Sequence, residues 1–213
     1  MTGVVPVGQK HLELADWRRR TAGMYAAIRE ASDIQLAWRA FIAARDGMFT
    51  IHPQSPLGSE QIVTFGGLSY YPYDPAFRIA GRLDFSVAAD SVAIDLPHDG
   101  PFRMTRMAAV HFTAGGQANR LSLFWIEGYG GGLFLPFRDR TNQTATYGGG
   151  RYLYDTIKGA DLGTGRQEIL LDFNFAYNPS CAYSVQWVCP LPPAENTLDI
   201  SITAGEKRFE SPA

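Results

Sequence analysis

The segment Arg78-Ile-Ala-Gly-Arg-Leu-Asp-Phe-Ser-Val87 alternates between two kinds of side chain. Its odd positions are apolar or glycine, and its even positions are mostly polar or charged. Because successive side chains of a β-strand point to opposite faces, this period of two predicts a half-buried strand. After a short turn, Val92, Ile94 and Leu96 repeat the pattern and predict a second strand.

Similar short runs continue toward the C-terminus, and turn signals such as Gly115-Gly116 and Gly159 separate them. They lie near residues 104–113, 120–127, 133–138, 144–147, 151–155, 167–175 and 198–203. About nine strands without helices between them exclude a parallel βαβ sheet. The pattern predicts an antiparallel β-sandwich or β-barrel.

The N-terminal part of the chain has helical periodicity instead. Apolar residues recur at intervals of three and four over residues 12–30, which predicts an amphipathic helix. Ser32 and Gln35 have the spacing of a capping box, so we expect a second helix to begin there and reach about residue 50. Two short helices need a surface to pack on. We therefore predict one α+β domain, residues 1–213, with a helical hairpin (1–50) packed on a β-rich body (51–213).

Composition limits the classes of partner. The chain has 213 residues, 46% of them hydrophobic, and a net charge of −2, which supports a substantial core but no basic surface for nucleic acid. No run of about 18 apolar residues predicts a membrane span, and residues 1–10 do not resemble a signal peptide. We expect a cytoplasmic protein that binds neither nucleic acid nor membranes.

Two glycine triplets, Gly130–Gly132 and Gly148–Gly150, allow unusual backbone conformations. Neither has the spacing of a dinucleotide fingerprint or of a phosphate-binding P-loop, so we expect no cofactor. They fit either bulges and corners of a barrel or a backbone surface that a ligand approaches closely.

Several segments resemble a known family. They are Tyr129–Asp139, Thr146–Tyr152, Asp172–Tyr183, Cys189–Asn196 and Ala204–Glu206, together with the earlier runs His52–Leu57 and Tyr71–Pro75. They are similar to the signature segments of domain-of-unknown-function family 1684, a group of bacterial and archaeal proteins of about this length. The resemblance implies a prokaryotic, single-domain protein, and it implies neither an activity nor site residues.

Polar residues beside the glycines are candidates for ligand contact. Arg138 and Arg151 lie where apolar strands meet turns, and a guanidinium can bind a carboxylate or phosphate with two hydrogen bonds. The competing interpretation is an internal ion pair, either Arg138 with Asp139 or Arg151 with Asp172. The remaining ligand-binding candidates are Tyr147, Asp172, Asn174 and Asn178, with Asp172 and Asn174 expected on one face of a strand.

Candidate acid–base groups are few. Glu127 is expected to share a strand face with Leu121, Leu123 and Trp125, and a carboxylate among apolar neighbours must pair or have a raised pKa. His52 is the other candidate, although its place beside prolines also fits an anchor at a helix end. No histidine lies in a metal-binding motif, so we predict no metal site.

Cys181 and Cys189 are separated by seven residues in a proline-rich segment. Two reduced structural thiols, a disulfide, a zinc site completed from elsewhere and a nucleophilic cysteine all remain open.

These observations favour a protein that binds a small polar or anionic molecule in a β-barrel pocket. Two other classes remain open. One is a metal-independent enzyme that uses Glu127 or His52 as general acid or base. The other is an assembly module in which Tyr177, Tyr183 and Trp187 form a homodimer face.

Overall fold

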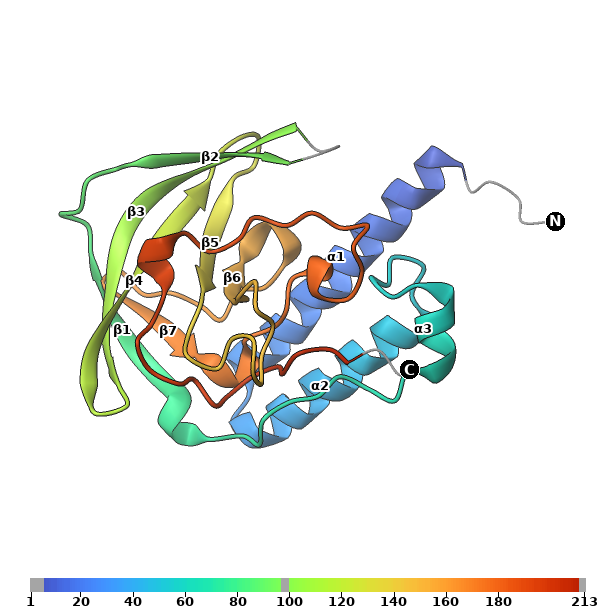
Figure 1. Ribbon diagram of the computed structural model, residues 1–213, viewed down its shortest axis with the longest axis horizontal. Helices are drawn as coiled ribbons and strands as arrows, with labels where there is room; N and C mark the ends of the chain where they lie inside the picture. The colour runs from blue at the N-terminus through green and yellow to red at the C-terminus, as the bar shows by residue number, and fades with distance from the viewer. Residues whose placement is uncertain (1–5, 97–99, 211–213) are drawn as a thin grey trace.

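The computed structural model describes residues 6–96 and 100–210 and begins with a helical hairpin. Helix α1 (Val7–Glu30) and helix α2 (Ile34–Ile51) lie side by side, and the short helix α3 (Ser59–Thr64) follows them (Figure 1). The predicted hairpin is confirmed. None of the helices in the described part of the chain combines the length and the apolar character needed to cross a bilayer.

The start of α2 differs from the expected capping box. Asp33 is the N-cap, and its carboxylate accepts a hydrogen bond from the backbone amide of Leu36 at 3.0 Å. Because α2 begins one residue later than predicted, Gln35 occupies the second helical position, where it cannot complete a capping box with Ser32.

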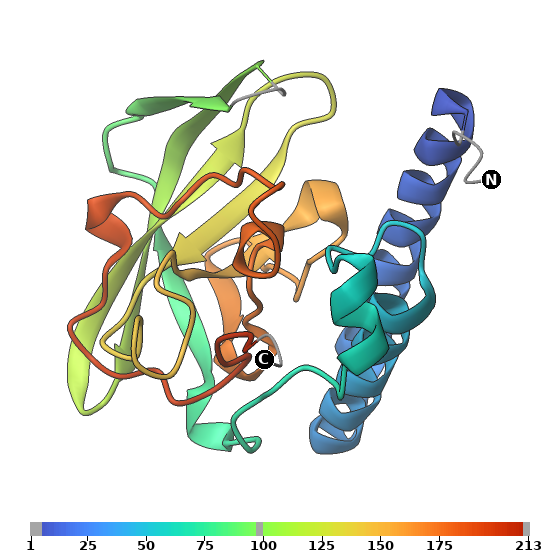
Figure 2. The same ribbon diagram turned by 45° about the vertical axis from the view of Figure 1, so that its right-hand side comes forward.

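The body of the protein is an antiparallel sheet that curls into a half-barrel (Figures 1 and 2). Its seven strands are β1 (Arg78–Asp84), β2 (Ser91–Leu96), β3 (Gly100–Ala114), β4 (Gln117–Ile126), β5 (Gly132–Phe137), β6 (Arg151–Asp155) and β7 (Glu168–Asp172). The strand order is β6-β5-β4-β3-β1-β7, and β2 pairs with the first part of β3. The α+β fold class is therefore confirmed.

Two irregularities accompany the curl of the sheet. The register between β3 and β4 shifts between Arg106 and Ala108, and the register between β5 and β6 shifts between Leu135 and Pro136. A bulge bends its strand and increases the local twist, so shifts in the long central strand and near one end of the sheet favour a curved sheet over a flat one. Proline at the second shift also removes one backbone donor from the ladder.

Two of the nine expected strands are not present in the described residues. Segment 144–147 lies in a tight turn, where the amides of Thr144, Ala145 and Thr146 all point to the carbonyl of Thr141. Segment 198–203 bends at Asp199 and Ile200 and is held by single backbone and side-chain contacts rather than by a ladder. Strand β7 also ends early, because Asp172 caps a short 3₁₀ helix, Phe173–Phe175.

The core lies between the concave face of the sheet and the helical hairpin. Figure 2 shows the part of the chain just after β7 between these two layers. There the ring of Phe175 meets the ring of Phe41 on α2 edge-on, with 5.2 Å between centroids. Tyr25 on α1 meets the same Phe41 ring at 5.5 Å. The irregular C-terminal segments thus join the helices to the sheet.

Candidate functional site

A buried ion pair joins the helical hairpin to the C-terminal segment. Arg45 on α2 is 8% exposed, and its Nη2 lies 2.9 Å from Oε2 of Glu206, which is 1% exposed. The guanidinium of Arg45 also lies over the rings of Phe41, Phe49 and Tyr177, at 5.6, 5.3 and 5.3 Å from their centroids. The positive charge of Arg45 is therefore held by one carboxylate and three aromatic faces.

The sequence places Arg45 there by helical geometry. Phe41, Met48 and Phe49, which lie three or four positions away, are all buried on the same side of α2. An arginine in the middle of this apolar stripe was the signal that sequence analysis missed. The segment Ala204–Glu206 was noticed only for its family resemblance.

Glu206 is fixed by several donors besides Arg45. The hydroxyl of Tyr183 donates to Oε1, and Asn178 donates from its backbone amide to Oε2 and from Nδ2 to Oε1, both at 3.1 Å. Burial raises the pKa of Glu206, while Arg45 and these hydrogen bonds oppose that effect.

Gly205 allows the chain to place Glu206 at this position. Gly205 has a φ of +78°, and a Cβ atom there would lie 2.6 Å from the carbonyl oxygen of Phe173. Only glycine fits this close approach of two backbone segments.

Three buried polar atoms of this cluster have no hydrogen-bond partner within residues 6–96 and 100–210. They are the hydroxyl of Tyr25, Nε of Arg45 and Oδ1 of Asn178. Leaving a buried donor or acceptor unsatisfied costs about 1–3 kcal/mol, so such atoms call for an explanation.

The same three residues line a cavity between the helical hairpin and the body. The cavity holds about 60 Å³ of space for water-sized molecules, and its walls include Trp17, Met24, Phe49, Tyr177 and Lys158. At roughly 10–15 Å³ of such space per water, about four to six waters fit. The cluster of Arg45, Glu206, Tyr25, Asn178 and Tyr183, with its cavity, is hereafter the hairpin cavity.

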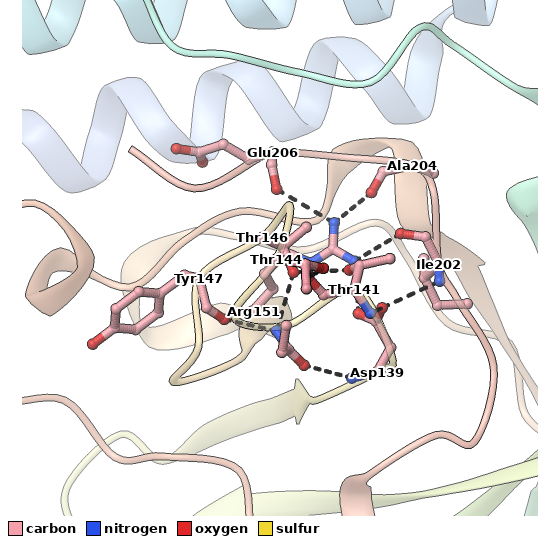
Figure 3. A network of polar contacts seen from close by, with 10 residues as sticks. Asp139, Thr141, Thr144, Thr146, Tyr147, Arg151, Ile202, Ala204 and Glu206 are labelled. Atoms are coloured by element: carbon pink, nitrogen blue, oxygen red, sulfur yellow. Dashed lines mark hydrogen bonds and ion pairs between the residues drawn. The ribbon is translucent and has the colours of Figure 1, made fainter. Parts of the chain in front are cut away.

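The predicted ligand contact of Arg151 does not fit its position. Arg151 is fully buried, and Figure 3 shows its guanidinium surrounded by the turn after β5 and by the C-terminal segment. It lies 2.8 Å from Asp139 Oδ2 and donates to the carbonyls of Ile202, Ala204 and Glu206. These contacts attach the C-terminal segment to the sheet and leave the guanidinium inaccessible to a ligand.

The buried ion pair is thus Arg151 with Asp139. It is neither of the two ion pairs that the sequence led us to expect. Arg138 is half-buried, and its backbone bonds to Asn196 and Leu198 at 2.8 Å each. Its Nε atom has no hydrogen-bond partner in the part of the chain that the structure describes. Arg138 does not line the hairpin cavity.

Asp172 and Asn174 belong to a separate structural contact. Asp172 is fully buried, lies 3.4 Å from Nη1 of Arg78, and accepts a hydrogen bond from Asn174 Nδ2 at 2.9 Å. Asn174 also exchanges two hydrogen bonds with the backbone of Asp74. The expected common strand face is wrong because β7 ends at Asp172. Burial raises the pKa of Asp172, yet the pair serves to join the end of β7 to the loop before β1.

The two acid–base candidates lie in different surroundings. Glu127 is exposed just after β4 and accepts hydrogen bonds from Thr105 and Ser91, so the expectation of apolar neighbours is wrong. His52 is buried at the end of α2, with Nε2 3.2 Å from Oδ2 of Asp16 on α1. Its Nδ1 accepts the amide of Gln54 at 3.1 Å, which is the arrangement of a helix-end anchor.

Tyr147 lies beside the cysteines rather than in the hairpin cavity. Its hydroxyl donates to Sγ of Cys181 at 3.6 Å, and Cys181 and Cys189 are both free and half-buried. In the described residues, no three His, Cys, Asp or Glu side chains are grouped so that they could hold a metal ion.

Asn178 is the one predicted ligand residue in the hairpin cavity. The aromatic residues expected at a homodimer face also turn inward: Tyr183 is 5% exposed and Tyr177 packs against the core, whereas Trp187 is 38% exposed. Tyr183 and part of Tyr177 therefore pack within their own chain, and a homodimer face stays a prediction.

The fold and site define an α+β protein in which a helical hairpin covers a curled antiparallel sheet over a buried ionic cluster. The model of the family described as protein of unknown function (DUF1684) matches residues 63–207. The chain belongs to this family, as its sequence segments indicated.

A solved relative has the same architecture. An uncharacterised protein of Haloarcula marismortui, determined in solution by NMR, is 35% identical, with a TM-score of 0.61. The match covers 81% of this chain and 93% of the other. No curated protein matches the chain. Because the family match begins at residue 63, it includes Asn178 and Glu206 but not Arg45.

Proposed function

We propose that the protein binds a small polar molecule in the hairpin cavity. The observation that carries the proposal is the convergence there of three buried polar atoms without partners, on Tyr25, Arg45 and Asn178. A ligand that bonds to them would remove the cost of leaving each unsatisfied.

The three atoms define the chemistry of the ligand. Nε of Arg45 is a donor, Oδ1 of Asn178 is an acceptor, and the hydroxyl of Tyr25 can act as either. The matching molecule therefore carries at least one acceptor and one donor. A volume of about 60 Å³ limits it to the size of about four to six waters.

Charge favours a neutral molecule over an anion. Glu206 already balances the positive charge of Arg45 at 2.9 Å, so an anion would place a second negative charge in the same buried cluster. Trp17, Met24 and Phe49 supply apolar walls, as apolar side chains do in most binding pockets.

The test is a thermal-shift screen of the full-length protein with neutral polar compounds of about four to six non-hydrogen atoms. A compound at about 100 times its Kd stabilises the folded state by about 2.7 kcal/mol, which raises Tm by about 5–11 °C for a chain of this size. Calorimetric titration then gives Kd for each variant.

Tyr25→Phe and Tyr73→Phe form a matched pair. Each removes a buried hydroxyl that lacks a partner, but only Tyr25 lines the hairpin cavity. We expect Tyr25→Phe to fold normally and to weaken binding about tenfold, the effect of one lost hydrogen bond. Tyr73→Phe should bind as wild type.

Two results would overturn the proposal. One is a screen in which no compound of this class raises Tm, or in which Tyr25→Phe and Tyr73→Phe bind equally well. The other is a high-resolution crystal structure in which ordered waters satisfy all three atoms and remain there in the presence of every compound.

A further inference from the structure

The loop after α3, the turn before β6 and the C-terminal segment enclose a second pocket, hereafter the C-terminal pocket. It holds about 350 Å³ of space for water-sized molecules, and sites for small molecules commonly measure about 300–1,000 Å³. It shares no lining residue with the hairpin cavity, so the two sites are separate. The lining residues that matter here are Phe65, Ser69, Tyr71, Lys207, Arg208 and Phe209.

Backbone hydrogen bonds fix the walls of the C-terminal pocket. The amide of Lys207 donates to the carbonyl of Ser69 at 2.8 Å, which joins the C-terminal segment to the loop after α3. The amide of Arg208 donates to the carbonyl of Ala145 at 3.0 Å, which adds the turn before β6. The fold itself therefore holds the three segments of the pocket together.

The pairing of two segments decides which side chains line the C-terminal pocket. Tyr70 and Glu206 form an antiparallel bridge, and Glu206 turns inward to meet Arg45 while Tyr70 packs against the core. Successive side chains of extended backbone point to opposite faces, and the next residues, Tyr71 and Lys207, both line the pocket. Nζ of Lys207 lies 4.9 Å from the centroid of the Tyr71 ring, so a cation–π contact positions the ammonium group.

The C-terminal pocket has one positive charge in excess. Arg208 pairs with Glu210 at 2.9 Å, so these two charges offset each other. Lys207 belongs to no ion pair within residues 6–96 and 100–210. The ring of Tyr71 attracts the ammonium group but leaves its charge in place. An anion in the pocket would therefore meet a cation that no carboxylate of the described residues holds.

Two phenylalanine rings give the C-terminal pocket an apolar wall. The centroids of Phe65 and Phe209 lie 6.5 Å apart, and both side chains are half-buried. Phe65 stacks on Phe49 of α2, and Phe209 meets Tyr183 edge-on, so both rings are held in place. Covering apolar surface is favourable, so the wall suits an anion with an apolar body better than an inorganic anion.

We propose that the C-terminal pocket binds a small carboxylic acid with an aromatic body. The carboxylate pairs with Lys207, and the ring covers Phe65 and Phe209. The hydroxyl of Ser69, in the same lining, is a donor for the second carboxylate oxygen. The proposal does not depend on ligand binding in the hairpin cavity.

The experiment is an NMR titration of the isotope-labelled, full-length protein with benzoate and with phenylacetate. We expect saturable shifts at amides of the lining segments, residues 65–71, 144–145 and 207–210. Benzamide has the shape of benzoate without its charge, and acetate has the charge without the ring, so both should bind more weakly. Added salt should weaken benzoate binding, because the pocket opens to solvent at the exposed Arg208 and Glu210.

Lys10→Met is the control for Lys207→Met. Each change removes one positive charge and keeps an unbranched apolar stem, but Lys10 is exposed on α1 and lies outside the C-terminal pocket. We expect Lys207→Met to weaken benzoate binding about 10- to 100-fold, the effect of losing a hydrogen bond to a charged group. Lys10→Met should bind benzoate as wild type, and so should Tyr25→Phe, which changes only the hairpin cavity.

Four results would overturn the proposal. They are no saturable binding of either acid, binding of benzamide as tight as that of benzoate, equal binding by Lys207→Met and Lys10→Met, and shifts centred on the hairpin cavity. Circular dichroism checks that each variant is folded. Because Tyr25→Phe tests the hairpin cavity and Lys207→Met tests the C-terminal pocket, the failure of one proposal is distinguishable from the failure of the other.

Discussion

The fully buried pair of Arg151 and Asp139 leads to a strong prediction about stability. In Arg151→Met the unbranched apolar stem is kept, but the guanidinium with its charge and donors is lost. Asp139 then remains as a buried carboxylate without its partner at 2.8 Å, and the carbonyls of Ile202 and Ala204 lose their donor.

The expected magnitude follows from this geometry. Removing one member of a buried ion pair costs about 3–5 kcal/mol, because the remaining charge stays uncompensated. For a chain of 150–250 residues, this corresponds to a fall in Tm of about 6–20 °C. Urea unfolding, followed by tryptophan fluorescence, measures the loss in free energy of unfolding directly.

Arg140→Met is the matched control. Arg140 pairs with Asp199 at 2.7 Å, but the two side chains are 61% and 83% exposed, so we expect a change of about 0.5 kcal/mol or less. Arg151→Lys keeps the charge with fewer donors and should fall between wild type and Arg151→Met. If Arg151→Met loses less than about 1 kcal/mol, or no more than Arg140→Met, the structural role of Arg151 is refuted.

Three further predictions concern backbone and charge. Gly205→Ala should lower the free energy of unfolding, measured in urea, by about 2 kcal/mol or more. The reason is that the φ of Gly205 is +78° and the new Cβ would lie 2.6 Å from a backbone oxygen. A loss below about 0.5 kcal/mol would contradict this. Gly47→Ala, inside α2 with no atom within 4 Å of the new Cβ, should raise the free energy of unfolding by about 0.5–1 kcal/mol, and a loss would contradict the assignment. Burial raises the pKa of Glu206, so the folded state favours the neutral carboxyl. The stability of wild type relative to Glu206→Gln should therefore be greatest below pH 4.5 and should fall as the pH rises through the folded pKa. A difference in stability that stays constant or rises between about pH 4 and 8 would contradict this.

Repeated patterns made most of the fold predictable. The alternation in 78–87 gave a strand that is present as β1, and the three- and four-residue spacing in the N-terminal part gave the helical hairpin. Helix α2 began one residue later than expected because Asp33 competes with Ser32 for the capping position.

Prediction from the sequence failed where a regular repeat of apolar side chains does not reflect a regular element. Segment 198–203 contains apolar residues at strand-like spacing, yet it forms no ladder: two of its backbone groups bond to the backbone just after β5, and Ile202 bonds to the side chains of Arg151 and Asp139. A side chain that arrives from another part of the chain can satisfy the backbone as a strand would, and nothing within 198–203 shows that it is there.

The candidate site was still harder to predict. Asn178 was a predicted ligand residue and lines the hairpin cavity, but the ion pair beside it joins Arg45 and Glu206, which are 161 residues apart in the chain. The position of Arg45 within the apolar stripe of α2 indicates a buried charge. Nothing in the sequence shows which carboxylate of the chain would pair with Arg45.

By itself, the sequence determined the helices, most of the strands and the family. The helices and strands depend on local backbone preference and on which face of an element is apolar. Residues close together in the sequence determine both properties. Only the tertiary structure decided that Arg151 pairs with Asp139, that Arg45 meets Glu206 under the hairpin, and that Tyr147 reaches Cys181. Burial strengthens an ion pair or a hydrogen bond because the surroundings have a low dielectric constant. At these points the burial comes from segments that are far apart in the chain and pack against one another.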